Sequence, residues 1–406
     1  MTQVVRPDQT VVVLCPGGGH VQRLLPLVAG LAARGVTVHV FTRTEGRIQV
    51  EAAGGIFLDL FAKYPLEAVD STSIPIPSRL VTFAAAYAEP LISAVATLRP
   101  ALLVYDSFMV VAPLIGRRLG IPYVGMRAGH AQVPAHAVAE IRNDPRVATD
   151  AACLAAVQKL RDEYGMSEAN PFSYLEGLSP YLNLYPEPAR FLREEARRAF
   201  EPVAFFGSLA PDLREATSRE RPLAARNGRI RVYVSFGSVI WRYYADVALA
   251  AMATLAEILA ERDAEALVSL GNHKIDDAVR RTIERADIRL ASYVDQWGAL
   301  KDADLFVTHH GLNSSHEAVF HQVPMLSYPF FGDQPAMAQC CQDLGLALPL
   351  SQAPRVQLQA TAARQAFDAI NAQRSAFAAR LAEARTWELE VIEQREAVLD
   401  RVLGLV

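Results

Sequence analysis

Short apolar runs rich in β-branched residues alternate with segments of helical periodicity along most of this chain. In the first half, such runs cover residues 10–14, 36–42, 101–105 and 123–125. Between the first two runs, apolar residues recur at helical spacing from Val21 to Leu31, and Gly35 ends the pattern. A strand, a helix and a second strand in this order form a βαβ unit, which belongs to a parallel sheet with helices on both faces. We therefore expect an α/β fold.

The same alternation begins again in the second half, with apolar runs at 230–235, 266–270, 288–291, 305–308 and 325–328. Between the halves, the segment 206–228 contains Gly, Pro, Arg and Glu in the proportions of an exposed linker. A length of 406 residues also fits two domains better than one. We predict a first Rossmann-like domain at 1–210, a linker at 211–228, a second Rossmann-like domain at 229–386 and a C-terminal helix at 387–406.

The overall composition argues against several classes of partner. The chain is 51% hydrophobic and has 40 Lys+Arg against 44 Asp+Glu, so it lacks the basic excess that nucleic acids attract. Its most apolar window, 80–98, has Glu89-Pro90 at the middle, which favours a buried helix over a membrane span. The four cysteines have no CxxC spacing, which fits a reducing compartment, and the apolar run 11–14 is too short for a signal-peptide core. We expect a cytoplasmic protein with no nucleic-acid partner and no membrane span.

A glycine-rich turn, Cys15-Pro-Gly-Gly-Gly-His20, joins the first expected strand to the first expected helix. Such a turn lets a ligand approach the backbone and points helix amides at it. The dinucleotide-binding fingerprint needs a further glycine at the position of Gln22, which disfavours a nicotinamide enzyme. His20 remains as a functional candidate at the ligand-binding edge of the sheet. The alternative is a solvent-exposed histidine at a helix start.

Asp106 directly follows the apolar run 101–105, so it should lie at the same sheet edge as His20. A carboxylate there can hold one imidazole nitrogen and stabilise the charge that forms when the other nitrogen takes a proton. We therefore predict that His20 and Asp106 form a general-base dyad. The alternative for Asp106 is a helix N-cap or a turn former.

The segment 307–321 contains the densest group of polar residues. A strand that ends at Thr308, followed by Gly311 and an Asn313-Ser314 helix start, predicts an anion site for a diphosphate, with His309 alongside. Alternatives remain open. His316-Glu317 is followed by His321, one residue too far for a zinc-binding HExxH motif. Ser314 and Glu317 also match a capping box, His310 is interpreted as a turn residue, and His321 as a surface or satisfied helix residue.

These motifs together resemble the UDP-glycosyltransferases, an inverting family whose GT-B fold places two Rossmann-like domains across a cleft. The family's donor signature is matched by Thr308-His309-His310-Gly311-Leu312-Asn313-Ser314-Ser315-His316-Glu317, Val323-Pro324-Met325 and Asp333-Gln334. Gly19-His20, Tyr105-Asp106-Ser107-Phe108 and Ser235-Phe236-Gly237-Ser238 match in order. The chain is most similar to soluble bacterial members that act on small molecules.

The resemblance implies that His20 is the catalytic base, that Asp106 is its partner and that the second half binds the nucleotide sugar. It implies Glu317 on the ribose hydroxyls, Asp333 and Gln334 on the sugar, no metal, and a C-terminal helix at 387–406 that crosses back onto the first domain. The implied donor-binding residues are Gly19, Gly237, Ser238, Tyr293, Gln296, His309, Gly311, Asn313, Ser314, Glu317, Asp333 and Gln334. The sequence departs from the family where Tyr293 replaces a Trp that stacks on uracil, and where Leu312 and Met337 replace Trp and Asn. These departures bear on the sugar rather than the reaction class.

The first domain forms the acceptor pocket in this family. Position alone makes Phe83, Tyr87, Met126, His130 and His136 the candidates, and their mostly apolar character predicts a hydrophobic or aromatic acceptor. Each of these is as readily interpreted as a core residue. The predicted function is transfer of a hexose from a UDP-sugar to a small molecule. The alternatives are a nucleotide-sugar 2-epimerase of the same fold, a non-catalytic relative that binds the donor, and an NAD enzyme.

Overall fold

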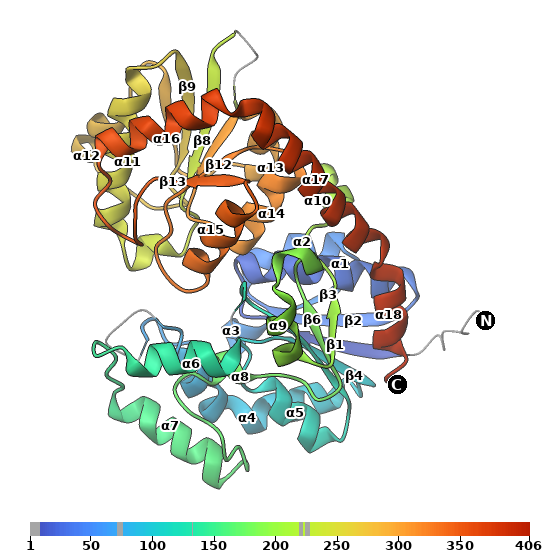
Figure 1. Ribbon diagram of the computed structural model, residues 1–406. Helices are drawn as coiled ribbons and strands as arrows, with labels where there is room; N and C mark the ends of the chain where they lie inside the picture. Colours follow the sequence, from blue (N-terminus) through green and yellow to red (C-terminus); the bar gives the residue numbers. More distant parts are fainter. Residues whose placement is uncertain (1–8, 71–75, 132, 219–221, 224–227) are drawn as a thin grey trace. The chain divides into compact units, whose positions relative to one another are not determined.

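The computed structural model describes residues 9–70, 76–131, 133–218, 222–223 and 228–406. Contacts divide the chain into two compact units. The first comprises Met1–Ala128, Gln132–Ala210 and Val391–Val406, and the second comprises Gly129–Ala131 and Pro211–Glu390. Each unit contains one parallel sheet with helices on both faces (Figure 1). The predicted α/β fold class is confirmed.

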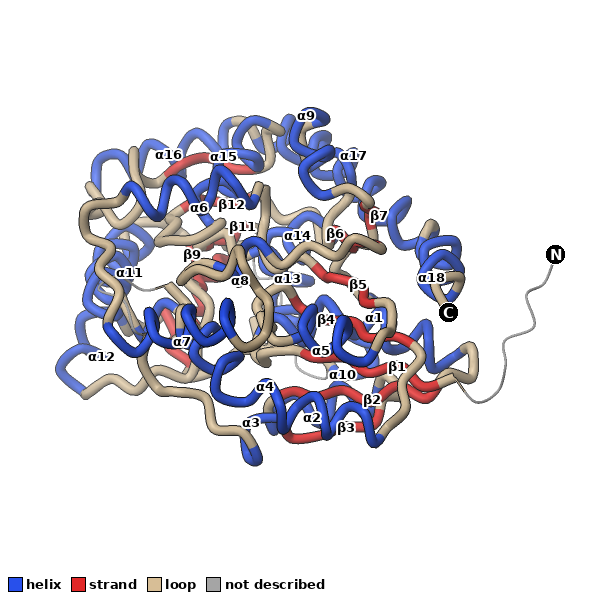
Figure 2. Tube along the Cα trace, turned by 90° about the horizontal axis from the view of Figure 1, so that it is seen from below, coloured by secondary structure: helices blue, strands red, loops and turns tan. Residues whose placement is uncertain are grey.

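The first unit has a seven-stranded sheet in the order β3-β2-β1-β4-β5-β6-β7, which can be followed strand by strand in Figure 2. Every pairing in it is parallel. The strands are β1 (Thr10–Leu14), β2 (Thr37–Thr42), β3 (Ile56–Asp59), β4 (Leu102–Asp106), β5 (Tyr123–Met126), β6 (Leu182–Tyr185) and β7 (Val203–Phe205). Fully buried β-branched and leucine side chains in β1 and β4 form the centre of the core, as expected of strands covered on both faces.

Parallel strands are joined by crossover connections, and helices form these connections in the first unit. They are α1 (Gly19–Ala33), α2 (Arg47–Ala52), α3 (Leu60–Lys63), α4 (Arg79–Thr97), α5 (Ala112–Leu119), α6 (Pro134–Asn143), α7 (Ala151–Asp162), α8 (Ser173–Glu176) and α9 (Glu194–Arg197). In Figure 1, α1 and α2 lie on one face of the sheet, and α4, α5 and α7 lie on the other.

Helix α4 is the segment that most resembles a membrane span by length and composition. It is the one such helix among the described residues, and 56% of its apolar window is buried inside the protein. Its buried side chains, including Phe83 and Leu91, belong to the large hydrophobic cluster of the first unit. The sequence predicted a buried helix here, and α4 is one.

The second unit has a six-stranded sheet in the order β10-β9-β8-β11-β12-β13, again with parallel pairings throughout. The strands are β8 (Ile230–Ser235), β9 (Ala264–Ser269), β10 (Ile288–Ala291), β11 (Leu305–Thr308), β12 (Met325–Ser327) and β13 (Ala347–Pro349). The helices are α10 (Pro211–Thr217), α11 (Ala245–Ala260), α12 (Asp277–Ile283), α13 (Gln296–Asp302), α14 (Leu312–Phe320), α15 (Gln334–Asp343), α16 (Ala360–Ala372) and most of α17 (Arg374–Glu393).

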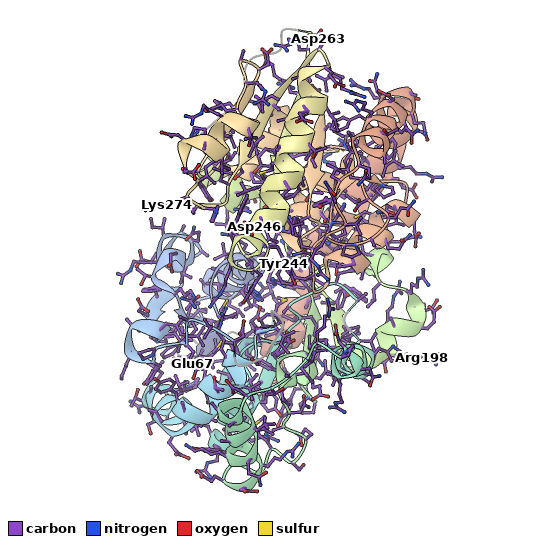
Figure 3. All side chains as sticks on the ribbon, turned by 90° about the vertical axis from the view of Figure 1, so that its left-hand side faces the viewer. Glu67, Arg198, Tyr244, Asp246, Asp263 and Lys274 are labelled. Carbon is purple, nitrogen blue, oxygen red and sulfur yellow. The ribbon has the colours of Figure 1, made fainter. Side chains whose placement is uncertain are left out.

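Helix α11 crosses one face of the second sheet from end to end. Figure 3 shows Tyr244 and Asp246 at its start and Asp263 beyond its opposite end. Asp263 accepts a hydrogen bond from Arg229 Nε at 2.8 Å, just before β8 begins. This exposed ion pair joins the two ends of the β8-α11-β9 crossover.

Two segments differ from the sequence-based expectation. The predicted linker at 211–228 begins with a helix, α10, that belongs to the second unit, and its residues 219–221 and 224–227 lie outside the described residues. The predicted C-terminal helix at 387–406 is the end of α17 followed by α18 (Arg395–Leu403). Helix α18 packs on α1, where Arg34 pairs with Glu396 at 2.6 Å and Leu399 lies against Gly30.

Candidate active site

The first group of candidate residues lies at the carboxyl ends of β1 and β4. The chain passes from β1 to β2 and β3 and then returns to β4 on the other side of β1, so the strand order reverses between β1 and β4. Open α/β sheets bind ligands at such a reversal. His20 is the second residue of α1, directly after the glycine turn, and Asp106 is the last residue of β4. The fold therefore brings these two predicted residues together.

His20 and Asp106 are hydrogen-bonded. The distance from His20 Nδ1 to Asp106 Oδ2 is 2.8 Å, and Asp106 Oδ1 accepts the backbone N–H of Phe108 at 2.9 Å. The Asp106 side chain is fully buried, whereas the His20 side chain is 23% exposed. Both carboxylate oxygens are thus committed to fixed donors, and the imidazole is held with one side toward solvent.

The charge state of Asp106 determines which nitrogen of His20 is basic. Burial by itself would raise the pKa of Asp106, but the charge and hydrogen bond of His20 and the charge of Arg23 outweigh it, so the pKa lies below its ordinary value. An ionised carboxylate can only accept hydrogen bonds, so His20 Nδ1 carries the proton. In the neutral ring this leaves the lone pair on Nε2, which is the arrangement of a general base.

Several neighbours of this pair were missed by the sequence analysis. The ring of Phe108 lies 4.7 Å from that of His20, and Tyr174 packs edge-on against Phe108 at 5.1 Å. Arg23, one turn after His20 on α1, is buried and donates to the backbone carbonyl of Ala128. The sequence could have indicated that Arg23 lies near His20, because residues three apart on a helix share a face.

The second group of candidates occupies the equivalent position in the second unit. There the strand order reverses between β8 and β11. Gly237 and Ser238 follow β8, and His309 follows β11, three residues before α14 begins. The predicted donor residues of these two segments therefore lie at the ligand-binding edge of the second sheet.

The imidazole of His309 lies between two glycines. A Cβ atom added to Gly237 would be 2.6 Å from His309 Nε2, and one added to Gly311 would be 2.5 Å from it. Gly237 also has a φ of 74°, which side chains rarely adopt. Burial of His309 lowers its pKa to about 4 despite an interaction with the backbone of Ser235. At neutral pH this histidine is uncharged, so it can donate a hydrogen bond to an anion without adding a positive charge.

Glu317 of α14 is the centre of a polar cluster in the second unit. Its carboxylate is 1% exposed and accepts a hydrogen bond from Gln296 Nε2 at 2.8 Å. Gln296 Nε2 also lies 3.1 Å from Ser314 Oγ. The other carboxylate oxygen of Glu317 forms an ion pair with Arg214 of α10. The structure brings three predicted donor residues together and adds Arg214, which the sequence analysis assigned to the linker.

Two alternatives for the 307–321 segment are settled by these contacts. Helix α14 has Gly311 as its N-cap and no side-chain cap, so the capping-box interpretation of Ser314 and Glu317 is wrong. His310 does adopt a turn conformation, with φ of 60°, but it is also fully buried. Its ring nitrogens lie 3.0 Å from Ser315 Oγ and 2.8 Å from Ser327 Oγ, so His310 joins α14 to β12.

The last residue of this segment is His321, which the sequence predicted to be a surface or satisfied helix residue. His321 directly follows α14, and its ring packs edge-on against Trp297 at 4.3 Å. Burial lowers the pKa of His321 to about 4. Within the described ranges, no group of three or more His, Cys, Asp or Glu residues is placed to hold a metal ion.

The remaining predicted donor residues differ in their exposure and contacts. Tyr293 is 68% exposed, which leaves its ring accessible, and it lies three residues before Gln296. Asp333 accepts the backbone N–H of His130 at 3.0 Å. Gln334 Oε1 accepts the backbone N–H groups of Phe330 at 2.9 Å and Phe331 at 3.3 Å. Gln334 can therefore offer a ligand its amide NH₂ more readily than its oxygen. Ser238 is exposed and Asn313 half-buried in the first turn of α14, while Gly19 is exposed at the start of α1.

Comparison with known proteins shows what the chain is similar to. The family model described as UDP-glucoronosyl and UDP-glucosyl transferase matches residues 214–355, which include β8 to β13 and every predicted donor residue except Gly19. This part of the chain therefore matches the UDP-glycosyltransferase family. The protein described as uncharacterized UDP-glucosyltransferase YdhE, from Bacillus subtilis (strain 168), is 22% identical over 362 residues, covering 85% of this chain and 86% of the relative.

Solved structures extend the likeness to the whole chain. The glycotransferase of kitacinnamycin has a TM-score of 0.74 at 21% identity and covers 99% of both chains. The spinosyn rhamnosyltransferase SpnG in complex with thymidine diphosphate has a TM-score of 0.64 at 18% identity, over 98% of this chain and all of that one. These likenesses show the GT-B fold. Together with the family match, they identify the protein as a glycosyltransferase.

The acceptor candidates of this glycosyltransferase are dispersed. Phe83 and Tyr87 lie on α4 with ring centroids 5.2 Å apart, and Met126 is paired with Asp106 in the sheet register. Phe83 and Met126 are buried, as core residues are, and Tyr87 is half-buried. His136 is exposed on α6. His130 is buried in the segment Gly129–Ala131, which groups with the second unit.

Proposed function

We propose that this glycosyltransferase moves a hexose, such as glucose, from a UDP-sugar to a hydroxyl of a small hydrophobic or aromatic acceptor, with inversion at the anomeric carbon. The observation that carries the proposal is the 2.8 Å hydrogen bond between His20 Nδ1 and Asp106 Oδ2. It directs the basic nitrogen Nε2 away from the carboxylate and toward a substrate.

In the proposed reaction, His20 Nε2 takes the proton of the acceptor hydroxyl while the ionised Asp106 stabilises the imidazolium. The acceptor oxygen forms a bond to the anomeric carbon as the bond from that carbon to the UDP oxygen breaks. UDP leaves with the bonding electrons. A single displacement inverts the anomeric configuration, and it needs no carboxylate nucleophile, unlike retaining glycosidases.

The second unit would bind and stabilise the leaving group. The amides at the start of α14, together with Asn313 and Ser314, would donate hydrogen bonds to the diphosphate, and the neutral ring of His309 would add one more. Glu317 would accept from the ribose hydroxyls, and the exposed ring of Tyr293 would stack on uracil. Asp333 and Gln334 would contact the sugar. The description of the matching family model supports a UDP-sugar, and the thymidine diphosphate bound to SpnG makes dTDP the comparison to test.

Aromatic rings of the first unit support the acceptor class. The Phe108 ring packs against His20, and the Tyr174 ring packs against Phe108. On α4, Phe83 and Tyr87 pack against each other. Aromatic and apolar side chains beside a few polar groups are typical of sites for drug-sized molecules. The structural relative named for kitacinnamycin is consistent with a natural product as acceptor.

The test is an assay with UDP-glucose and a panel of phenolic and aliphatic acceptors, followed by mass spectrometry and by NMR of the anomeric proton. We expect an acceptor-dependent product of inverted configuration with wild-type protein and none with His20→Ala. Conversion of the sugar nucleotide to an epimer in the absence of acceptor would replace the proposal with the 2-epimerase. UDP binding with no turnover of any donor would indicate a non-catalytic relative.

A further inference from the structure

Helix α10 lies in the segment whose composition suggested a linker, yet side chains at its C-terminal end attach it to the second unit. Arg214 pairs with Glu317 of α14. Glu215 accepts from Trp297 Nε1 at 2.8 Å and pairs with Lys301 of α13. Just after the helix, Ser218 Oγ donates to Asp295 at 2.5 Å. Contacts to both α13 and α14 fix the place of α10 beside the predicted nucleoside site.

The ion pair with Arg214 compensates the negative charge of the buried Glu317 carboxylate. Glu317 is 1% exposed and lies on the helix whose start is expected to bind a diphosphate. A buried carboxylate without a counter-charge is strongly disfavoured and would also repel that ligand. The Arg214 guanidinium, which is always charged in proteins, supplies the counter-charge and is itself 26% exposed.

The hydrogen bonds also fix the orientation of the Glu317 carboxylate. Arg214 donates to Oε1 of Glu317, and Gln296 Nε2 donates to Oε2 at 2.8 Å. Each carboxylate oxygen has two lone-pair directions, so one acceptor position on each oxygen remains. Two adjacent acceptor positions match the two neighbouring hydroxyls of a ribose. A 2′-deoxyribose would satisfy only one of them.

We propose that Arg214 is a positioning residue of the donor site, and that by orienting Glu317 it makes the enzyme select ribonucleoside over 2′-deoxyribonucleoside diphosphates. This inference rests on the proposed function, because it takes the nucleotide donor as given. Arg214 acts through Glu317 and does not itself contact the diphosphate or the reacting atoms.

The test compares UDP, 2′-deoxy-UDP and uridine by calorimetric titration, because 2′-deoxy-UDP differs from UDP in one hydroxyl and uridine lacks the diphosphate. The variants are Arg214→Ala and Arg214→Lys. The matched control is Arg364→Ala, which removes an exposed ion pair with Glu261 elsewhere in the second unit. Thermal melting of each variant checks that it folds. If Arg214→Ala does not fold, Arg214→Lys still tests the inference, because lysine keeps the positive charge.

We expect the wild-type enzyme to prefer UDP over 2′-deoxy-UDP by about tenfold or more, as for one hydrogen bond to a charged group. Arg214→Ala should weaken UDP and uridine alike by about tenfold and reduce the preference for UDP toward equality. Arg214→Lys should retain part of the preference, and Arg364→Ala all of it.

A folded Arg214→Ala variant that keeps the full preference for UDP would overturn the inference and leave Arg214 a merely stabilising role. A loss confined to UDP, with uridine unaffected, would also overturn it, because it would place Arg214 on the diphosphate. Failure of the proposed function would give a different result, because the wild-type protein would then bind none of UDP, 2′-deoxy-UDP and uridine.

Discussion

Each unit places a histidine at the point where the strand order of its sheet reverses, but the two histidines have opposite surroundings. His20 follows β1 and is hydrogen-bonded to the carboxylate of Asp106. His309 follows β11 and lies between Gly237 and Gly311, where burial lowers its pKa to about 4. We propose that the same topological position supplies a base in one unit and a neutral hydrogen-bond donor in the other. In that proposal the neighbours, rather than the fold, determine the chemistry of each histidine.

The charges around the two sites also differ. In the first unit, the negative charge of Asp106 is next to the histidine, where we propose that it serves proton transfer. In the second unit, the negative charge of Glu317 is balanced by Arg214, and we propose that it serves binding. This comparison predicts that changes in the first unit affect turnover, whereas changes in the second affect donor affinity.

Replacement of His20 by alanine should have the largest effect. We expect kcat to fall by about 10³-fold, within the range of general-base contributions, and the Kd for UDP to stay unchanged. Steady-state kinetics and calorimetry measure the two quantities. Arg364→Ala, which removes an exposed ion pair with Glu261 in the second unit, is the control and should keep full activity. Wild-type turnover in the His20 variant would refute the dyad.

Asp106→Asn should lower kcat by about 10²-fold. The asparagine side chain keeps the shape of the aspartate but removes the charge that stabilises the imidazolium, and its amide can favour the wrong tautomer of His20. The same kinetic assay measures the effect, with the Kd for UDP as internal control. A variant with unchanged kcat would show that Asp106 only holds the loop through Phe108.

Gly311→Ala should weaken UDP binding by about tenfold, or about 1.4 kcal/mol. Gly311 has an ordinary φ of −60°, so alanine strains no backbone there, but its Cβ would lie 2.5 Å from His309 Nε2 and displace the ring. The control is Gly177→Ala in the first unit, whose Cβ would meet nothing closer than 3.6 Å. If Gly311→Ala lowers kcat at saturating donor and leaves donor affinity intact, the assignment of functions to the two units fails.

The smallest expected effect is on stability between pH 7 and pH 6. Burial lowers the pKa values of His309, His310 and His321 to about 4, 3 and 4. The unfolded chain binds protons at these histidines near pH 6.5 and the folded chain does not, so stability is present above pH 6.5 and falls as the pH drops through it. Each histidine contributes less than about 1 kcal/mol over this interval.

Hydrogen exchange measures this effect separately in each unit. Protection of the second unit should fall toward pH 6. In the first unit, burial also lowers the pKa of His39, a β2 residue that is only partly buried, and the stability that the lowered pKa of Asp106 provides is lost only below its ordinary value of 3.8. Protection of the first unit should therefore fall less than that of the second. His310→Gln should reduce the pH dependence. Protection that rises in the second unit toward pH 6 would contradict the burial of these histidines.

The sequence predicted the fold because the central strands are strongly apolar and bounded by turn residues. The bounds of β1, β8, β10 and β11 coincide with the predicted ranges. Four strands were missed. Of these, β7 and β13 have three residues each, β13 ends on a proline, and β3 has only partly buried or exposed side chains. Runs this short or this exposed lack a periodicity that distinguishes them from loops.

The candidate site was predictable where a residue ends a strand. Asp106 and His309 both directly follow apolar runs, and parallel strands bring such positions to one edge. Arg214 was not predictable, because it is one of several arginines in a linker-like segment and lies 103 residues from Glu317 in sequence. Only the folded position of α10 shows that the two side chains meet.

The proposal assigns proton transfer to the first unit and donor binding to the second. The measurement that tests it most directly is a calorimetric titration of UDP, with dTDP and NAD in parallel, into wild-type protein, His20→Ala and Glu317→Ala. Wild type and His20→Ala should bind UDP with equal affinity, Glu317→Ala should bind it at least about tenfold more weakly, and NAD should not bind. Loss of UDP binding in His20→Ala, or unchanged binding in Glu317→Ala, would contradict the assignment of proton transfer to the first unit and donor binding to the second.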